Sequence, residues 1–470
     1  MREDLRRRLR ELGVVRGVRE LTTPPLSSPS GGKRTPRRRV AIEDLLPGRF
    51  YTTSHGRCFV VEVTYPHDHH HGDLPLSAFL NLPTGVAAQV AQDGALADVN
   101  LRRVCFLDTE TTGLSGGTGT MAFVVGLGYF DEVGFRLRQY FLRDPGDEPA
   151  MVEALAEILP EFEALVSFNG RAFDVPILEN RFILARISPP TAGVPHLDLL
   201  HPARRLWRYH LPSCGLTTLE REVLGVRREQ DDVPSGIIPY LYRDYLRTGD
   251  AREMKRVLYH NAVDILSLVT LASRLCRTFA DPWANALSGA EFYALGRWYE
   301  AEGCLIEAER AYRAAIRAGL AADLRSKALR DLGYLLKRAD RRAEALACWQ
   351  QLALETRGDV LAHVELAKYF EWHVGNLSLT AGWTRAALAL VENWPSGTRR
   401  DIALAELRHR LARLERRLGR CSPPIASTTP ERGGNARPTS RPATTSASPA
   451  PIKSRRRVPS RRCSPTGTSR

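Results

Sequence analysis

The segment from Val104 to Phe130 constrains the fold of this chain most strongly, because a dense apolar run ends there in two closely spaced acids. It reads VCFLDTETTGLSGGTGTMAFVVGLGYF. The apolar residues before Asp108 are typical of a buried strand. Side chains alternate faces along a strand, so Asp108 and Glu110 are expected on one side and Thr109 on the other. The pattern therefore predicts two neighbouring carboxylates at the end of a buried strand.

Two like charges on one face of a buried strand are unfavourable unless a cation lies between them. Carboxylate oxygens are ligands that Mg²⁺ and Mn²⁺ prefer, and ligands gather at the ends of strands in α/β folds. Acids with this spacing also occur on surface strands, but the apolar run favours metal binding. The loop SGGTGT that follows lacks the lysine of a P-loop and leads into a strand, which favours a simple turn.

Two further segments carry polar residues that could complete such a site. In LVSFNGRAFDVPILENRF, Asp174 directly precedes an amphipathic helix. Its carboxylate could cap that helix, or it could face the first two acids. In YHNAVDILSLVTL, His260 and Asp264 are four residues apart and share one helical face. They could form a surface ion pair, or the helix could return to the sheet and present both toward Asp108.

The stretch 101–280 alternates short apolar strands with helical periods. Three strands come first and helices then alternate with further strands, an order that predicts an α/β domain with a mixed sheet flanked by helices and suits an RNase H-like domain. The expected strands are 103–108, 121–130, 135–142, 164–168 and 195–199, and the expected helices are near 148–160, 175–187 and 251–277.

Strand signals vanish after about residue 285, and an all-α domain is expected over 285–420. Gly296 aligns with Gly333, and Tyr312 with Trp349, at an offset of 37 residues; Trp349 aligns with Trp383 at 34. Small residues at helix contacts and aromatic residues between helices, repeated with this period, resemble a tetratricopeptide array. An ordinary helical bundle is the alternative. Stacked helix pairs form a concave surface, so a protein partner is expected there.

The remaining segments are shorter or richer in helix breakers. Residues 1–40 are expected to form a basic N-terminal helix and linker, and residues 41–100 a small β-containing lead-in region around a strand at 56–65. The histidine cluster 67–71 could bind a metal ion, but adjacent histidines rarely point into one coordination sphere, which favours a structural or solvated loop. Ser, Thr, Pro and Arg dominate residues 421–470, which predicts a disordered basic tail.

The basic charge of the chain is concentrated at its ends. The formal net charge is +14; residues 1–39 hold 12 Lys/Arg against 4 Asp/Glu, and residues 421–470 hold 10 against 1, which leaves −3 for the part between them. Global basicity is therefore weak evidence for a nucleic-acid groove in the folded part. The tails could add salt-sensitive affinity for phosphates.

Composition also bounds the cellular location. No apolar run approaches the roughly 18–20 residues of a membrane span, and the first residues lack the apolar core of a secretory signal. The eight cysteines show no C-x-x-C spacing, which argues against a zinc or iron–sulfur site and suits a reducing compartment. We expect a soluble cytoplasmic protein that does not contact membranes.

Three segments in order, FLDTETTGL, FNGRAFDVPIL and YHNAVDILSL, resemble the exonuclease motifs of the DEDD branch of the RNase H-like superfamily. Within it the chain is most similar to the YprB-type proteins, bacterial RNase H-like predicted exonucleases, several of which carry C-terminal tetratricopeptide-like repeats. The likeness covers roughly residues 50–400. It implies that two Mg²⁺ or Mn²⁺ ions are held by Asp108, Glu110, Asp174 and Asp264.

The chain departs from many members of that group near the last motif. Those members place a tyrosine four residues before the final aspartate, or a histidine five residues before it. Here His260 is four residues before Asp264 and Tyr259 is five residues before it. Because His260 shares a helical face with Asp264, we expect His260 to be the catalytic base.

The resemblance implies a metal-dependent 3′–5′ exonuclease that acts on single-stranded nucleic-acid ends by a two-metal mechanism. An aromatic ring suits contact with a base, and the residues expected to position the terminal nucleotide are Thr109, Thr112, Leu114, Asn169 and Phe173. A noncatalytic nucleic-acid-binding adaptor that recruits partners through its helical repeats is the alternative. Binding alone, however, does not require four acids.

Overall fold

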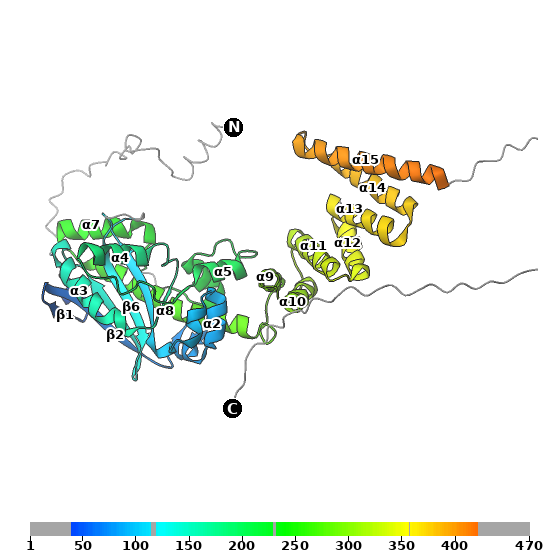
Figure 1. The fold of residues 1–470 in the computed structure, drawn as a ribbon. Helices are drawn as coiled ribbons and strands as arrows, with labels where there is room; N and C mark the ends of the chain where they lie inside the picture. The colour runs from blue at the N-terminus through cyan, green and yellow to red at the C-terminus, as the bar shows by residue number, and fades with distance from the viewer. Residues whose placement is uncertain (1–38, 114–118, 229–231, 357, 422–470) are drawn as a thin grey trace, which may run out of the picture.

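A computed structural model describes residues 39–113, 119–228, 232–356 and 358–421 of the chain. These residues form an α/β part that ends at Ala280 and an all-α part that begins at Gly289 (Figure 1). The fold class predicted from the sequence is thus confirmed. The predicted N-terminal helix and nearly all of the predicted basic tail lie outside the described residues.

A seven-stranded mixed sheet forms the centre of the α/β part, in the order β1-β2-β7-β6-β5-β8-β9. The strands β5, β8 and β9 are parallel to one another, and the remaining neighbours pair antiparallel. Their bounds are β1 (Gly48–Thr53), β2 (Gly56–Pro66), β5 (Val104–Thr111), β6 (Ala122–Phe130), β7 (Gly134–Phe141), β8 (Ala164–Ser167) and β9 (His196–Asp198). The lead-in region therefore contributes β1 and β2 to the same sheet.

The strand β5 is apolar throughout its first half because both faces of the sheet are covered. Cys105 and Leu107 pack into the core on one face, whereas Val104 and Phe106 pack into the core on the other. A strand buried on both faces reads as a continuous apolar run instead of an alternating one. This packing accounts for the VCFL sequence that precedes Asp108.

Helices cover both faces of the sheet. On one face lie α3 (Glu148–Ile158), α4 (Asp174–Leu184) and α7 (Ile238–Thr248), and on the other lie α2 (Thr84–Ala91) and α5 (Leu200–Trp207). The long helix α8 (Arg252–Ala280) contributes to both cores. Its residues up to Leu258 pack into the first core, and those from Ile265 onward pack into the second. The intervening turns of α8 can therefore carry polar side chains toward the sheet.

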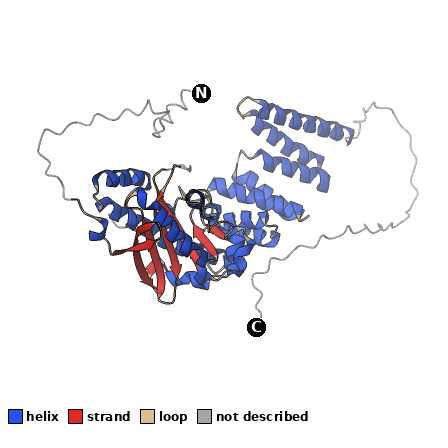
Figure 2. Ribbon diagram, turned by 60° about the vertical axis from the view of Figure 1, so that its left-hand side comes forward, coloured by secondary structure: helices blue, strands red, loops and turns tan. Residues whose placement is uncertain are grey.

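The all-α part consists of helices that pack against their neighbours in sequence order. They are α9 (Gly289–Ala301), α10 (Leu305–Ala318), α11 (Ala322–Arg338), α12 (Arg342–Glu355), α13 (Val360–Tyr369), α14 (Leu377–Glu392) and α15 (Thr398–Cys421), with a π-turn, η10 (Phe370–Val374), after α13. Figure 2 shows the strands, in red, within the α/β part, and the helices of the all-α part in blue.

Two of the predicted small-residue contacts occur between paired helices. A side chain added at Gly296 would come within 2.6 Å of the Tyr312 ring, and one added at Gly333 within 2.7 Å of the Trp349 ring. The helical pairs expected from the offset are therefore present, while their identity as tetratricopeptide repeats stays a prediction. Among the described helices, none combines the length and the apolar character that crossing a bilayer requires.

Candidate active site

The structure places Asp108 and Glu110 near the end of β5, between β6 and β8. Glu110 is followed by an irregularity in the pairing of β5 with β6, between Glu110 and Thr111. Such bulges re-aim side chains and occur often next to active sites. The two acids therefore come from a buried strand whose end is locally adjusted.

Asn261 fixes the first of these acids. Its Nδ2 donates to Asp108 Oδ2 at 2.8 Å, and its Oδ1 accepts from Gln139 Nε2 at 2.8 Å. Gln139 also donates to the carbonyl of Leu258, 2.7 Å away, so the amide is oriented from β7. A side chain at Gly126 would approach Asn261 Oδ1 to 2.3 Å. Glycine at this position on β6 thus makes room for the amide that holds Asp108.

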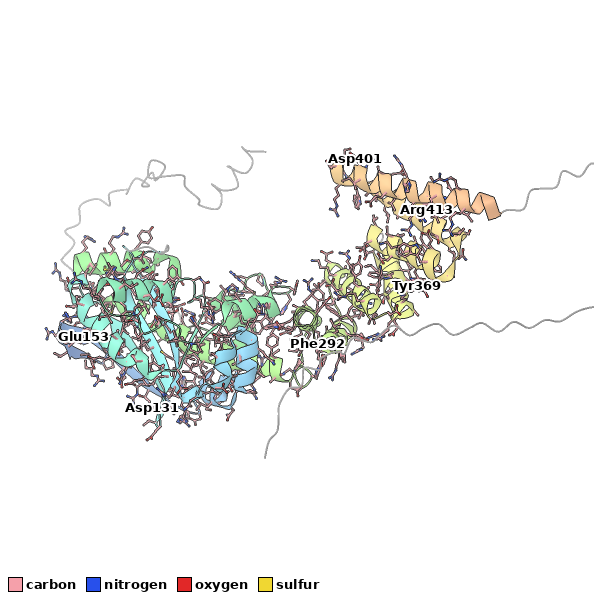
Figure 3. All side chains as sticks on the ribbon, viewed as in Figure 1. Asp131, Glu153, Phe292, Tyr369, Asp401 and Arg413 are labelled. Atoms are coloured by element: carbon pink, nitrogen blue, oxygen red, sulfur yellow. The ribbon has the colours of Figure 1, made fainter. Side chains whose placement is uncertain are left out.

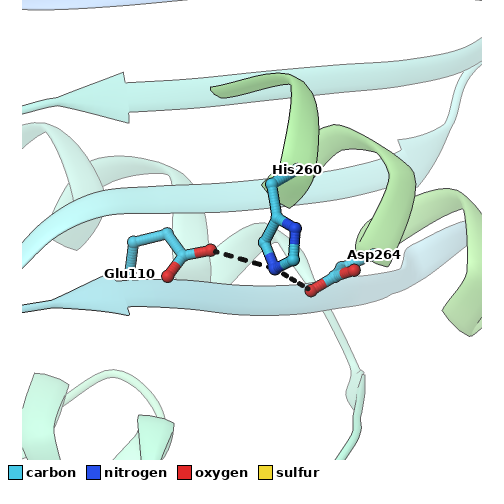
Figure 4. Close-up of side chains that lie close together, drawn as sticks. All are labelled: Glu110, His260 and Asp264. Atoms are coloured by element: carbon cyan, nitrogen blue, oxygen red, sulfur yellow. Dashed lines mark ion pairs between the residues drawn. The ribbon is translucent and has the colours of Figure 1, made fainter. Parts of the chain in front are cut away.

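The helix α8 brings His260 and Asp264 to the second acid. Nε2 of His260 lies 4.0 Å from Glu110 Oε1 and 3.5 Å from Asp264 Oδ2. One ligand atom from each of Glu110, His260 and Asp264 lies within 4.8 Å of the other two (Figure 4). All three side chains are at most 14% exposed. This group, here called the triad, could hold a metal ion.

Asp174 approaches the same region from the start of α4. Thr109, the residue between the two strand acids, donates through Oγ1 to Asp174 Oδ1 at 2.5 Å. The N-cap of α4 is Phe173, and no side-chain hydrogen bond caps the helix. Asp174 is therefore not the N-cap residue but the acid in the first turn of α4. Asp174 stands outside the triad, but it is tied to the same strand.

The ionisation of the four carboxyls shows that they are electrostatic neighbours. Burial raises the pKa of Asp108 well above its usual range, and the charges of Asp264, Asp174 and Glu110 raise it further. Burial followed by the charges of Asp264 and Asp174 raises the pKa of Glu110 in the same way. Burial also raises the pKa of Asp174, to about 6. Four carboxylates that are buried or partly buried and raise one another's pKa fit a hard divalent cation.

A buried arginine that the sequence patterns did not single out contacts the triad. Arg228 Nε and Nη2 lie 2.6 and 2.7 Å from the two carboxylate oxygens of Glu220, a fork geometry that orients the guanidinium. The other side of the guanidinium pairs with Asp264 Oδ1 and reaches His260 Nδ1 at 2.8 Å. Burial raises the pKa of Asp264, and His260 and Arg228 oppose that rise.

His260 is oriented by a second carboxylate. Its Nδ1 lies 2.7 Å from Asp232 Oδ1, while its Nε2 faces Glu110, Asp264 and, at 3.2 Å, the Ser235 hydroxyl. A carboxylate at Nδ1 favours the tautomer in which Nδ1 carries the proton, which leaves Nε2 as an acceptor. Tyr259 lines a cavity of about 370 Å³ with Tyr65, His69 and Arg228. His260 is thus a candidate within ion-pair distance of the acids.

The described residues among those predicted to position a nucleotide make different contacts. The Thr112 hydroxyl accepts from the Met121 backbone at 3.0 Å, and Asn169, which adopts φ +67°, donates its backbone N–H to Asp198 Oδ1 at 2.8 Å. Phe173 is half-buried and packs against the core beside α4. Leu114 lies outside the described residues. Thr109 is engaged with Asp174, as described above.

The histidine cluster is connected to the site through hydrogen bonds. His71 Nε2 lies 2.8 Å from the Ser267 hydroxyl, which donates to Glu220 Oε1 at 2.7 Å. Glu220 in turn holds Arg228. Burial lowers the pKa of His71 to about 4, so the ring is neutral at neutral pH. The hydrogen bond to Ser267 indicates a structural role for His71. Within the described ranges, the group that could hold a metal ion is the triad.

Several residues of the site were not expected from the sequence. Arg228, Asp232 and Glu220 come from the connection between α5 and α7, where no motif or period marks them. The burial of Asn261 could have been predicted, because Asn261 lies on the same helical face as the buried Ile265 and Leu268. A polar residue within an apolar stripe indicates a buried hydrogen-bond partner.

Two comparisons with known proteins bear on this arrangement. A family model described as the RNase H superfamily matches residues 105–276, a range that contains the triad, Asp108 and Asp174. The uncharacterized protein YprB of Bacillus subtilis (strain 168) is 32% identical over 323 residues, which cover 67% of this chain and 76% of that protein.

Proposed function

Because the chain belongs to the family of Bacillus subtilis YprB and carries an RNase H superfamily domain, we propose that it is a metal-dependent nuclease. More specifically, we propose a 3′–5′ exonuclease that hydrolyses phosphodiester bonds at single-stranded nucleic-acid ends. The observation that carries this proposal is the meeting of Glu110, His260 and Asp264, whose ligand atoms lie within 4.8 Å of one another, with the carboxyls of Asp108 and Asp174 as their electrostatic neighbours. A protein that only bound nucleic acid would have no use for such a set.

The carboxylates supply the binding site for the ions. Asp108, Glu110, Asp174 and Asp264 would hold two Mg²⁺ or Mn²⁺ ions and offset their four positive charges. When bound, the ions supply Lewis-acid stabilisation of the negative charge that builds up on the phosphate oxygens. Asn261 keeps Asp108 in its orientation, and Arg228 does the same for Asp264. The protein's own hydrogen bonds thus preorganise the ligand set before an ion arrives.

His260 is the proposed general base. Its Nε2 faces Glu110 and Asp264, and the Asp232 carboxylate at Nδ1 stabilises the imidazolium that forms when Nε2 accepts a proton from water. The residues proposed to position the terminal nucleotide are Thr109, Thr112, Leu114, Asn169 and Phe173. We further propose that the helices from Gly289 onward are tetratricopeptide-like and can bind a protein partner.

Substitution of Asp108 tests the proposal. Purified protein with Mn²⁺ or Mg²⁺ should shorten a 5′-labelled single-stranded oligonucleotide from its 3′ end. Asp108→Asn keeps the shape of the side chain but removes its charge, so the rate should fall by more than about 100-fold, because even loss of an outer-shell partner costs 10- to 100-fold. The exposed Asp401, on α15, offers a matched control, and Asp401→Asn should keep full activity.

Two results would count against the proposal. Hydrolysis by Asp108→Asn at the wild-type rate, in protein whose circular dichroism is unchanged, would remove the catalytic assignment. Tight oligonucleotide binding without any metal-dependent hydrolysis would favour the noncatalytic adaptor instead.

A further inference from the structure

The helical domain contains a cavity of about 260 Å³ that combines aromatic and basic side chains. It lies where the end of α11, α12, α13 and the π-turn η10 meet, in the part of the molecule around Tyr369 in Figure 3. We call it the helical-domain pocket and define it by Lys337, Arg342, Trp349, Lys368, Tyr369 and Trp372. The pocket belongs to a different part of the chain from the triad.

The π-turn η10 presents an aromatic ring to solvent. Trp372 is 60% exposed, although a large apolar side chain is normally covered. Its neighbour Glu371 points inward and pairs with Arg410 and Arg413 of α15, at 2.8 and 2.7 Å, so the turn is anchored from behind. The turn therefore holds the Trp372 ring outward on a fixed support.

The cations of the pocket outnumber its carboxylates. Lys337 and Lys368 both pair with the single buried carboxylate of Glu365, the latter at 2.7 Å. Arg342, which pairs with the exposed Asp340 at 2.7 Å, adds a third positive charge at the rim. Two carboxylates, one of them the exposed Asp340, do not neutralise three cations, so the pocket attracts an anion. The aromatic side chains Trp349, Tyr369 and Trp372 then determine which kind of anion fits the pocket.

Charge is also distributed unevenly along the folded chain. Residues 337–420 hold 15 Lys/Arg against 10 Asp/Glu, whereas residues 40–336, which include the candidate active site, hold 30 against 38. The far helices are thus the basic portion of an otherwise acidic body. A polyanion would be attracted to them in preference to the α/β part.

We propose that the helical-domain pocket binds one nucleotide of a single-stranded nucleic acid. The base would stack on Trp372 and Tyr369, and the adjoining phosphate would contact Lys337, Lys368 and Arg342. Aromatic platforms flanked by cations are how single strands are bound without sequence preference. An acidic peptide would use the cations alone and leave the exposed indole without a stacking partner. The inference rests on the proposed function, because the pocket would bind another part of the same strand that the candidate active site hydrolyses.

Binding without hydrolysis tests the pocket. The full-length protein is titrated against a fluorescent single-stranded oligonucleotide in EDTA, and affinity is read from anisotropy. Trp372→Ala should weaken binding by about 5- to 150-fold, the effect of losing one stacked base, and Trp372→Phe should restore most of it. Because Trp372 is exposed, neither variant should disturb folding, which circular dichroism can verify.

Tyr240 provides a matched control for this variant. It is 64% exposed on α7 and an arginine, Arg243, lies 5.4 Å from its ring, much as Arg410 lies 5.7 Å from the ring of Trp372. Tyr240→Ala should bind the oligonucleotide as the wild type does. An equal loss in both variants would overturn the assignment, because it would show a general effect of removing exposed rings.

The proposed phosphate-binding cations predict a change in salt dependence. In Lys337→Gln, Lys368 still neutralises Glu365, so the buried carboxylate keeps a cationic partner. For a single strand, removing one cation that binds a phosphate should reduce the slope of log affinity against log salt by about 0.7. The double variant Lys337→Gln with Arg342→Gln should therefore give a shallower slope by about 1.4. An unchanged slope would contradict the proposal. The proposal would also be contradicted if Trp372→Ala bound the oligonucleotide normally and an acidic peptide displaced the oligonucleotide from the wild type but not from Trp372→Ala.

Failure of this inference is separate from failure of the proposed function. If the protein hydrolyses oligonucleotides with Mn²⁺ but Trp372→Ala binds normally in EDTA, the pocket assignment is wrong and the nuclease stands. If Trp372→Ala loses binding but no hydrolysis occurs with any metal, the pocket stands and the nuclease is wrong.

Discussion

The ring of His260 is held between two different environments. On the Nδ1 side lie Asp232 and Arg228, and on the Nε2 side lie Glu110 and Asp264. In the tautomer whose Nδ1–H donates to Asp232, the basic Nε2 is directed to the acids. The spacing of His260 and Asp264 in the sequence predicted that they share a face. The neighbours that orient the ring come from a distant loop and could not be predicted from that spacing.

Substitutions at positions 259 and 260 distinguish the two candidates for the base. His260→Gln should lower kcat by about 10²- to 10⁴-fold, the usual contribution of a general base, with a much smaller change in oligonucleotide affinity. Tyr259→Phe should change kcat little, because Tyr259 lines the cavity beside Tyr65 and His69. Steady-state kinetics with a labelled oligonucleotide gives both values. The reverse ranking of the two variants would refute the assignment of the base to His260.

The elements that carry the site were largely predictable, because their patterns are local. The expected strand at 103–108 is observed as Val104–Thr111, and the expected helix at 251–277 as Arg252–Ala280. The dense VCFL run and the stripe of Ile265 and Leu268 are strong periodic signals. The pairing of β2 with β7 joins residues far apart in the chain. That pairing has no local signature, so the lead-in region could not be recognised as part of the sheet.

The crossing of α8 over β6 depends on a missing side chain. At Gly126 an added methyl group would meet Asn261 Oδ1 at 2.3 Å, which is closer than real contacts permit. Gly126→Ala should therefore displace Asn261 from Asp108 and lower the free energy of unfolding by about 1–3 kcal/mol, the usual cost of overpacking. Denaturant titration measures the stability, and the oligonucleotide assay measures the accompanying loss of activity.

Gly85 on α2 serves as the control for this helix–strand crossing. An added methyl group there meets no atom within 4 Å, so Gly85→Ala should leave stability equal or slightly raised, since alanine favours a helix over glycine. If Gly126→Ala were as stable and as active as Gly85→Ala, close approach of α8 to β6 would not be what positions Asp108.

The whole molecule combines an acidic α/β part that holds the candidate site with helices that become basic toward their far end. The net charge of the whole folded chain does not reveal this difference, because the negative charge of residues 40–336 and the positive charge of residues 337–420 nearly cancel. The aromatic and basic residues of the helical-domain pocket come from α11, α12, α13 and η10, so they form no stripe in the sequence. Only the fold brings them together. The proposed function thus uses two separate surfaces of one chain for a single strand.

In the proposed active site, four carboxylates from β5, α4 and α8 gather around divalent ions. Crystals grown with Mn²⁺ test this most directly, because anomalous scattering locates manganese independently of the protein atoms. We expect manganese peaks ligated by Asp108, Glu110 and Asp264, with Asp174 bound directly or through water, and their loss in crystals of Asp108→Asn. Ordered crystals with Mn²⁺ in excess but no anomalous peak among these residues would contradict the account.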